Sequence, residues 1–176
     1  PMAICLRYIG YDAFIPGNHE FNFGMDTLKR VIAQQKAKVL VGNVYAPDGT
    51  PLADGYTILN KQGVKVGVIG MVTPNITRWD SKNLEGWTVT NPVDECRKLT
   101  KQVDVLLGVM HMDPESEYGV YGSGARDLAE ACPEFDVIVA AHGHRSVPGE
   151  MINGVLVVEN SGNASTLSEI HLQLKR

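Results

Sequence analysis

The chain has 176 residues and a formal net charge of −4 at pH 7, with 44% hydrophobic and 20% charged residues. This length fits one globular domain that buries about 70% of its unfolded surface. No apolar run approaches the roughly 20 residues that cross a bilayer, and no basic stretch offers phosphate neutralisation, which argues against a membrane span and against nucleic-acid polymer binding. The chain begins at Pro1. We expect it to be cut from a longer protein, so its terminus does not reveal localisation.

The hydrophobic pattern predicts strands and helices along the whole chain. The expected helices cover 2–9, with Gly10 past the end, and 25–36, 91–102 and 124–132. The expected strands cover 11–15, 39–44, a hairpin of 56–61 with 64–72, 103–110, 135–141, 155–159 and an alternating segment around 170–174. Residues 73–90 lack periodicity, and we expect a long loop there that helps to wall a cleft. There are no internal repeats.

The most informative stretch is Ile15-Pro16-Gly17-Asn18-His19-Glu20-Phe21-Asn22-Phe23-Gly24. An apolar strand stops at Pro16-Gly17, and three polar or ionisable side chains follow in a row. Burying each of them unpaired would cost about 1–3 kcal/mol. A loop of this kind instead presents a carbonyl oxygen, an imidazole and a carboxylate to one point, as one corner of a metal-assisted hydrolytic site would.

Three predicted strands share a plan, since each opens with an Asp and ends in ligand-type side chains. Asn18 lies six residues after Asp12, His111 seven after Asp104, and His142 six after Asp136. Equal strand lengths would bring the carboxyl ends level, at the edge where α/β sheets bind ligands. The residues expected to converge on this rim are Asn18, His19, His111, His142 and His144.

The donor chemistry narrows the choice of ligand. Imidazoles with an amide oxygen, and no thiolate at the strand ends, suit Mn²⁺, Fe or Zn²⁺ better than a structural zinc. His142 and His144 flank Gly143 in what we expect to be an extended loop, so both could reach neighbouring metals. Two metals about 3.5–4 Å apart can hold a bridging hydroxide and clamp a phosphoryl group. They would also neutralise an anionic substrate on a negatively charged chain.

Structural explanations remain for the individual histidines. We interpret His171, on the polar face of the expected last strand, as a surface residue, and His111 taken alone could be one too. His142 and His144 by themselves are a weak metal signal. The chain has no GxSxG elbow, Walker A motif or GxGxxG after a strand, so a serine nucleophile and a phosphate-binding glycine loop have no support.

The three cysteines are scattered and odd in number. Cys5, Cys96 and Cys132 form no CxxC pair. We expect small buried apolar side chains on helices, rather than a disulfide framework or a zinc ribbon.

Several motifs resemble the calcineurin-like metallophosphoesterase superfamily. They are Gly17-Asn18-His19-Glu20, His111 after a hydrophobic strand, and His142 before Gly143-His144. The segments Gly42-Asn43-Val44-Tyr45, Trp79-Asp80 and Asn83-Leu84-Glu85-Gly86 narrow the resemblance to the 5′-nucleotidase branch. Within that branch the chain is most similar to bacterial 2′,3′-cyclic-nucleotide 2′-phosphodiesterase/3′-nucleotidases. The resemblance covers essentially the whole chain.

The resemblance implies an α/β fold, a four-layer αββα sandwich lacking its N-terminal strand or strands, with 1–176 as the later portion of the catalytic domain. It implies two divalent metal ions (Mn, Zn, Fe or similar), with Asn18, His111 and His142 on one ion and His144 on the other. His19 would be catalytic, placed against the phosphate to stabilise charge or protonate the leaving oxygen. Glu20 would hold the loop or orient a ring.

The chain departs from the family pattern in two ways. The Asp-x-His and Gly-Asp segments that carry further metal ligands are missing, and so is the nucleobase-binding C-terminal domain. The leading hypothesis is metal-dependent hydrolysis of nucleotide phosphate esters by metal-activated water. An alternative is a catalytically incompetent metal-binding fragment, and a third is the same scaffold acting on a sulfur ester. We also expect self-association through an exposed sheet edge, and the resemblance implies a periplasmic, cell-surface or secreted protein.

Overall fold

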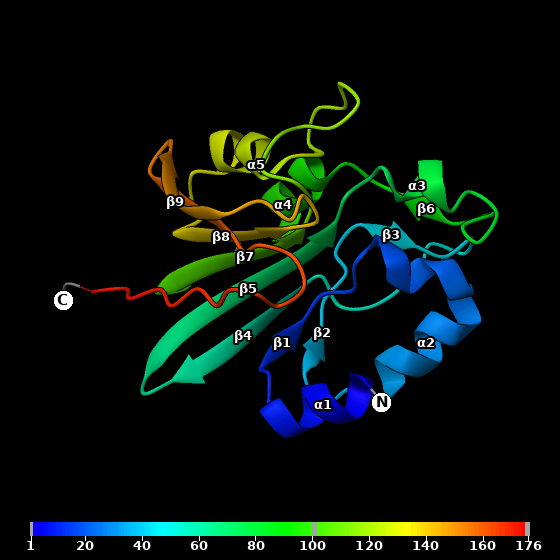
Figure 1. Cartoon of the computed structure of the whole chain (residues 1–176), viewed down its shortest axis with the longest axis horizontal. Helices are drawn as coiled ribbons and strands as arrows, with labels where there is room; N and C mark the ends of the chain where they lie inside the picture. Colours follow the sequence, from blue (N-terminus) through cyan, green and yellow to red (C-terminus); the bar gives the residue numbers. More distant parts are fainter. Residues whose placement is uncertain (1, 100–101, 175–176) are drawn as a thin grey trace.

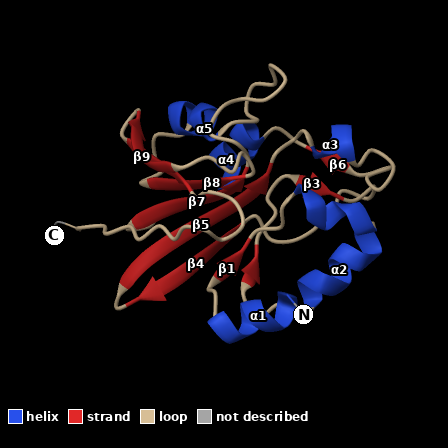
Figure 2. Cartoon of the chain, in the orientation of Figure 1, coloured by secondary structure: helices blue, strands red, loops and turns tan. Residues whose placement is uncertain are grey.

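The computed structural model describes residues 2–99 and 102–174, and it has a mixed α/β fold (Figures 1 and 2). Its centre is a six-stranded sheet in the order β4-β5-β7-β8-β10-β9. The strands are β4 (Tyr56–Lys61), β5 (Val64–Val72), β7 (Val105–His111), β8 (Val137–Ala141), β9 (Val147–Ile152) and β10 (Val155–Glu159). The inner strands β5, β7, β8 and β10 are parallel, whereas β4 and β9 are antiparallel to their neighbours.

The remaining elements lie on the two sides of this sheet (Figure 1). Helices α4 (Pro92–Leu99) and α5 (Ala125–Ala131) cover one face, where their side chains share a core with β5, β7, β8 and β10. The other side holds α1 (Met2–Ile9), α2 (Met25–Ala33) and a small parallel sheet of β1 (Ala13–Phe14) with β2 (Lys38–Val39). A second core forms around α2, the 3₁₀-helix η1 (Asn18–Phe23) and β3 (Val44–Tyr45). The expected α/β class is confirmed, with a helix–sheet–sheet–helix order in which β1 and β2 form the second sheet (Figure 1). Strands β3 and β6 (Thr88–Val89) form a further two-stranded sheet.

Local sequence explains the best-defined elements. The β4–β5 hairpin has the predicted bounds, and its turn residues Gln62 and Gly63 both have positive φ, as two-residue hairpin turns favour. Helix α4 begins after Asn91, whose side-chain oxygen accepts a hydrogen bond from the Val93 N–H at 2.9 Å. Its end was predicted at about Gln102; α4 is described as far as Leu99 and Gln102 is not helical, while residues 100–101 between them lie outside the described part of the chain.

Two aspartates at strand starts connect neighbouring parallel strands. Asp104 accepts a hydrogen bond from the Lys65 N–H, and Asp136 accepts one from the Leu106 N–H, both at 2.7 Å. These bonds extend the strand ladder at its amino end and fix the alignment of β5, β7 and β8. At the other end of the sheet, Val72 pairs with His111 in register.

Four sequence predictions are corrected. The strand expected over 39–44 is two short strands, β2 and β3, and the loop expected over 73–90 contains α3 (Ile76–Trp79) and β6 (Thr88–Val89). Strand β9 was not predicted. The strand expected around 170–174 is irregular chain, because no neighbouring strand pairs with it among the described residues.

The cysteine prediction is wrong in part. Cys96 and Cys132 are buried as expected, but they form a disulfide that joins α4 to the end of α5. Cys5 is exposed on α1 rather than buried.

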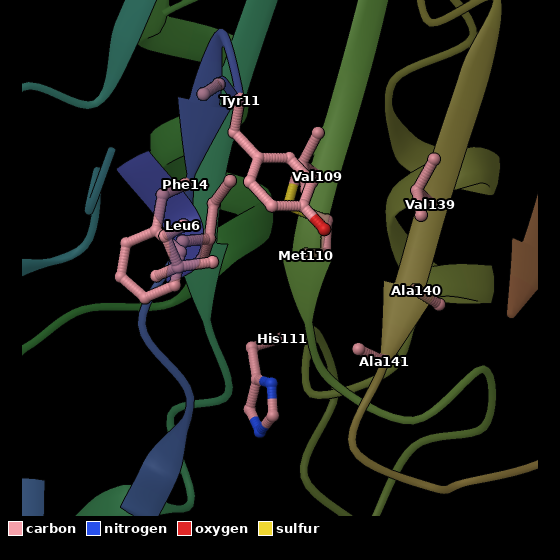
Figure 3. Close-up of a pocket in the computed structure, with 11 residues that line it drawn as sticks. Leu6, Tyr11, Phe14, Val109, Met110, His111, Val139, Ala140 and Ala141 are labelled. Carbon is pink, nitrogen blue, oxygen red and sulfur yellow. The ribbon is translucent and has the colours of Figure 1, made fainter. Parts of the chain in front are cut away.

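An apolar cavity of about 300 Å³ lies between the small sheet and the central sheet (Figure 3). Leu6, Tyr11 and Phe14 line one wall, and side chains of β7 and β8 line the other. His111 closes one end and is the only histidine, acid or base among the lining residues of the described chain. Such a lining does not suit a phosphate, so the polar groups beyond His111 define the candidate site.

Candidate active site

The site is centred on the amide oxygen of Asn18. This Oδ1 atom lies 2.9 Å from Nε2 of His111 and 3.2 Å from Nδ1 of His142. The rings of the two histidines meet edge to face, with centroids 5.2 Å apart. Residues separated by more than 100 positions of sequence therefore converge.

The central sheet brings His111 and His142 together as expected, while Asn18 lies outside that sheet. His111 ends β7 and pairs in register with Ala141, the last residue of β8, so His142 follows at the same level. Asn18 begins η1, directly after the small β1–β2 sheet, and is not on a strand of the central sheet. The expectation that all the ligands follow strands of one sheet is thus wrong for Asn18.

Gly17 is required by the close approach of His111. A Cβ atom at Gly17 would lie 2.7 Å from Cε1 and 2.9 Å from Nε2 of His111. The Gly17 N–H donates a hydrogen bond to Oε2 of Glu20 at 2.6 Å, which closes the turn on itself. Glu20 therefore holds the loop, the role that the resemblance implied.

The loop that carries His142 and His144 is not extended. Their φ angles are 96° and 53°, a left-handed conformation that costs about 1–3 kcal/mol per residue and persists where surrounding contacts impose it. Those contacts include Asp113, which is buried and accepts a hydrogen bond from Arg145 Nε at 3.1 Å. A Cβ at Gly143 would lie 2.0 Å from Oδ2 of this carboxylate, so only glycine fits between the two histidines.

Glu159, at the end of β10, lies buried beneath the same loop. Burial raises the pKa of Glu159, and the Asp113 carboxylate adds to the effect, while the backbone N–H groups of Gly143, His144 and Arg145 oppose it. Neither oxygen of the Glu159 carboxyl group has a hydrogen-bond partner among the described residues, so these N–H groups are near it without forming hydrogen bonds.

His142 is oriented by a residue that the sequence did not indicate. Its Nε2 atom lies 3.3 Å from Oε1 of Glu117, which leaves Nδ1 directed at Asn18. Carboxylates bound to the outer nitrogen of a ligating imidazole fix its orientation in metal sites. The Trp79 ring packs against the His142 ring, with the two ring centroids 5.2 Å apart. Glu117 lies in a loop of Gly and Ser residues, where no periodicity marks it.

The electrostatics keep His111 neutral. The pKa of His111 is lowered to about 4, chiefly by burial and to a smaller extent by repulsion from His142, His19 and His144. The neutral ring has a free lone pair, which is the form that binds a metal. The same effect shows that His19 and His144 lie close enough to act on this ring, although no hydrogen bond joins either to Asn18, His111 or His142 among the described residues.

The donor atoms fit a divalent cation. Two ligand atoms at right angles and about 2.0–2.2 Å from one ion are about 3 Å apart, and the observed separations are 2.9 and 3.2 Å. No three His, Cys, Asp or Glu side chains surround a common point within residues 2–99 and 102–174. The donor set that the structure brings together is thus two imidazoles and one amide oxygen. His171 is exposed and pairs with Glu169 at 3.0 Å, in keeping with its interpretation as a surface residue.

Two curated proteins are similar in sequence to most of this chain. The chain is 31% identical to the 2′,3′-cyclic-nucleotide 2′-phosphodiesterase/3′-nucleotidase of Haemophilus influenzae, over 85% of this chain and 25% of that protein. It is also 31% identical to the 5′-nucleotidase of Vibrio cholerae, over 79% of this chain and 27% of that protein. The chain thus spans about a quarter of the length of these curated relatives.

A solved structure is similar as well. The calcineurin-like phosphoesterase YfkN from Bacillus subtilis superposes with a TM-score of 0.80 at 30% identity, covering 92% of this chain and 57% of that one. Residues 4–147 match the family described as calcineurin-like phosphoesterase. The chain belongs to the calcineurin-like phosphoesterase family.

Proposed function

We propose that the protein containing this chain hydrolyses phosphate esters of nucleotides, with divalent metal ions as cofactors. The observation that carries the proposal is the convergence of Asn18, His111 and His142 within hydrogen-bonding distance. Two relatives are named for nucleotide phosphoester hydrolysis, and the family generally uses divalent metals. We propose nucleotides or 2′,3′-cyclic nucleotides as substrates, and Mn²⁺, Zn²⁺ or Fe as the ion.

Each residue has a distinct proposed role. Asn18, His111 and His142 would hold one ion, and His144 would hold a second. When bound, such ions polarise a phosphoryl oxygen and lower the pKa of a water molecule to near neutrality. His19, on the same turn as Asn18, would face the phosphate and donate a proton to the leaving oxygen.

A second candidate function is metal binding without catalysis. It is favoured by the small donor set, since only two imidazoles and one amide oxygen are in mutual contact among the described residues. Calorimetric titration with Mn²⁺ separates the two candidates. Two bound ions favour the enzyme, whereas at most one ion together with no turnover favours the binding module.

The direct test uses the protein expressed from its complete coding sequence. We expect Mn²⁺-dependent turnover of a nitrophenyl phosphodiester and of 2′,3′-cyclic AMP, and a loss of about 100-fold or more in His142→Ala and His19→Ala. His171→Ala is the matched control, because that side chain is exposed and paired only with Glu169. Wild-type rates in both His142→Ala and His19→Ala would refute the proposal.

Two further proposals concern the setting of the protein. We propose a periplasmic or cell-surface location, to be checked by fractionation of the source cells. No described helix has the length and apolar content to cross a membrane. We also propose self-association at the small β1–β2 sheet, and a strictly monomeric profile in light scattering at high concentration would contradict it.

A further inference from the structure

A line of hydrogen bonds leads from His19 to a buried carboxylate. Nδ1 of His19 lies 2.8 Å from Oδ1 of Asn22, one turn further along η1. Nδ2 of Asn22 donates to Oδ2 of Asp80 at 2.8 Å. Asp80 is only 7% exposed and follows directly after α3, 58 positions away in the sequence.

Asp80 is itself held in place. Nδ2 of Asn83 donates to Oδ1 of Asp80 and to the backbone oxygen of Asn22, both at 3.2 Å. The backbone N–H of Asp80 donates to the Ile76 carbonyl at 2.9 Å. Asn83 thus joins the Asp80 carboxylate to the backbone of Asn22, on the turn that carries His19.

The chemistry of the three groups fixes the direction of every bond. An ionised carboxylate only accepts, so Asn22 must turn its NH₂ group toward Asp80. The amide oxygen of Asn22 is then the atom that faces His19, and an oxygen can only accept from Nδ1. The proton of a neutral His19 must therefore lie on Nδ1, which leaves Nε2 as the free nitrogen of the ring.

We propose that Asp80 is a positioning residue, which acts through Asn22 to fix the tautomer and orientation of His19. This inference rests on the proposed function, in which Nε2 of His19 faces the phosphate. The ring protonated on both nitrogens gives its Nε2 proton to the leaving oxygen and is left in the Nδ1–H form that Asn22 selects. The amide link transmits orientation without placing a negative charge beside the imidazole. If Asp80 had only a structural role, the Asn22–Asp80 hydrogen bond would connect η1 to α3. In that case the tautomer of His19 would not depend on whether position 22 carries the amide and position 80 the carboxylate, or the reverse.

A reciprocal exchange tests the relay. In Asp80→Asn, two amides face each other and either can turn, so the orientation of Asn22 is no longer determined. In Asn22→Asp, two carboxylates lie within hydrogen-bonding distance and repel one another. The double variant Asn22→Asp/Asp80→Asn restores one acceptor beside Nδ1 of His19 and one donor behind it. Asp48→Asn is the matched control, since Asp48 is exposed and accepts from the Thr50 N–H in a distant turn.

The first measurement is the imidazole ¹⁵N spectrum of the metal-free protein, labelled at histidine, at alkaline pH. We expect the Nδ1–H form of His19 to dominate in the wild type and in Asp48→Asn, a mixture of tautomers in Asp80→Asn, and a return of the Nδ1–H form in the double variant. An unchanged tautomer in Asp80→Asn, or no return in the double variant, would overturn the inference. If Asp80→Asn does not fold, Asn22→Ala is measured in its place. Asn22→Ala removes the oxygen that accepts from Nδ1 of His19, so we expect the same mixture of His19 tautomers. An unchanged tautomer in Asn22→Ala would also overturn the inference.

The second measurement is turnover, with the protein made from its complete coding sequence. We expect kcat to fall about 10- to 100-fold in Asp80→Asn with little change in KM, and to recover in the double variant. The two failures are distinguishable. Absence of turnover in the wild type counts against the proposed function, whereas the ¹⁵N spectra decide the relay whether or not the protein is active.

Discussion

Replacement of Gly17 by alanine should damage the site without removing any ligand. The backbone at Gly17 has φ −87° and ψ 180°, a region that alanine adopts freely, so the substitution is not expected to strain the loop itself. The added Cβ would lie 2.7 Å from Cε1 and 2.9 Å from Nε2 of His111. Carbon atoms in contact are about 3.5–4.0 Å apart, so the imidazole must retreat by about 1 Å.

The displacement of the His111 ring allows an estimate of the loss in metal affinity. A displacement of about 1 Å is several times the tolerance of about 0.2 Å for metal–ligand distances. Loss of a partner that orients a metal ligand costs about 10- to 100-fold in metal affinity, which corresponds to about 1.4–2.7 kcal/mol. We therefore expect Gly17→Ala to bind Mn²⁺ about 10- to 100-fold more weakly in calorimetric titration, with a parallel loss of turnover.

Gly49→Ala is the control for this experiment. Gly49 has φ +83° and open space around the position of a Cβ, so alanine there should cost about 1–2 kcal/mol of folding free energy and leave metal affinity unchanged. Wild-type affinity in Gly17→Ala would show that the position of the His111 ring does not determine binding, and the geometric argument for the site would be lost.

Three further predictions concern pH, the core and the disulfide. The pKa of His111 is lowered from 6.5 to about 4, so in NMR spectra of the metal-free protein its imidazole protons should keep the chemical shifts of a neutral ring down to about pH 5. The free energy of unfolding linked to this ring should be fully present above pH 6.5 and fall by up to about 3 kcal/mol as the pH drops toward 4. Titration of His111 near pH 6.5 would contradict this. Leu128→Ala, at a fully buried position of α5, should lower the free energy of unfolding by about 2–5 kcal/mol in urea, whereas Leu167→Ala, at a position 92% exposed, should change it little. Reduction of the Cys96–Cys132 bond, which closes a segment with a sequence separation of 36, should lower stability by about 2–4 kcal/mol, and equal urea midpoints with and without reductant would refute that contribution.

The elements that sequence reasoning placed well are those whose signal is local. The hairpin β4–β5 was predicted with its observed bounds, because an apolar run and a two-residue turn determine it together. Strand β9 was not predicted because Pro148 and Gly149 interrupt the strand pattern in the sequence. An edge strand tolerates such residues. Asn153-Gly154, both with positive φ, was the local hairpin signal that could have revealed it.

The elements that were predicted wrongly depend on distant partners. The alternating residues near 170–174 have the period of a strand, but a strand needs an edge to pair with, and the described part of the chain supplies none. The disulfide likewise depends on how α4 and α5 pack, which sequence spacing does not reveal.

The site was predictable to the extent that its residues follow strand ends. His111 and His142 could be aligned by counting from Asp104 and Asp136, because these aspartates do begin neighbouring parallel strands. Asp80 could not be found in this way. Asp80 lies in a segment without periodicity, and only its hydrogen bond with Asn22 in the structure indicates a role for it.

The in-register ladder at the end of β7 has a consequence for how the protein can fail. His111 stands opposite Val72 on one side and Ala141 on the other. Because side chains alternate between the faces of a strand, a slip of β7 by one position would turn the imidazole to the opposite face and put Met110 in its place. A misaligned molecule could then keep its secondary structure while the core contacts of Leu106 and Met110 and the position of the imidazole are both lost. If the proposed metal site is correct, metal binding would report correct strand alignment, which circular dichroism would miss.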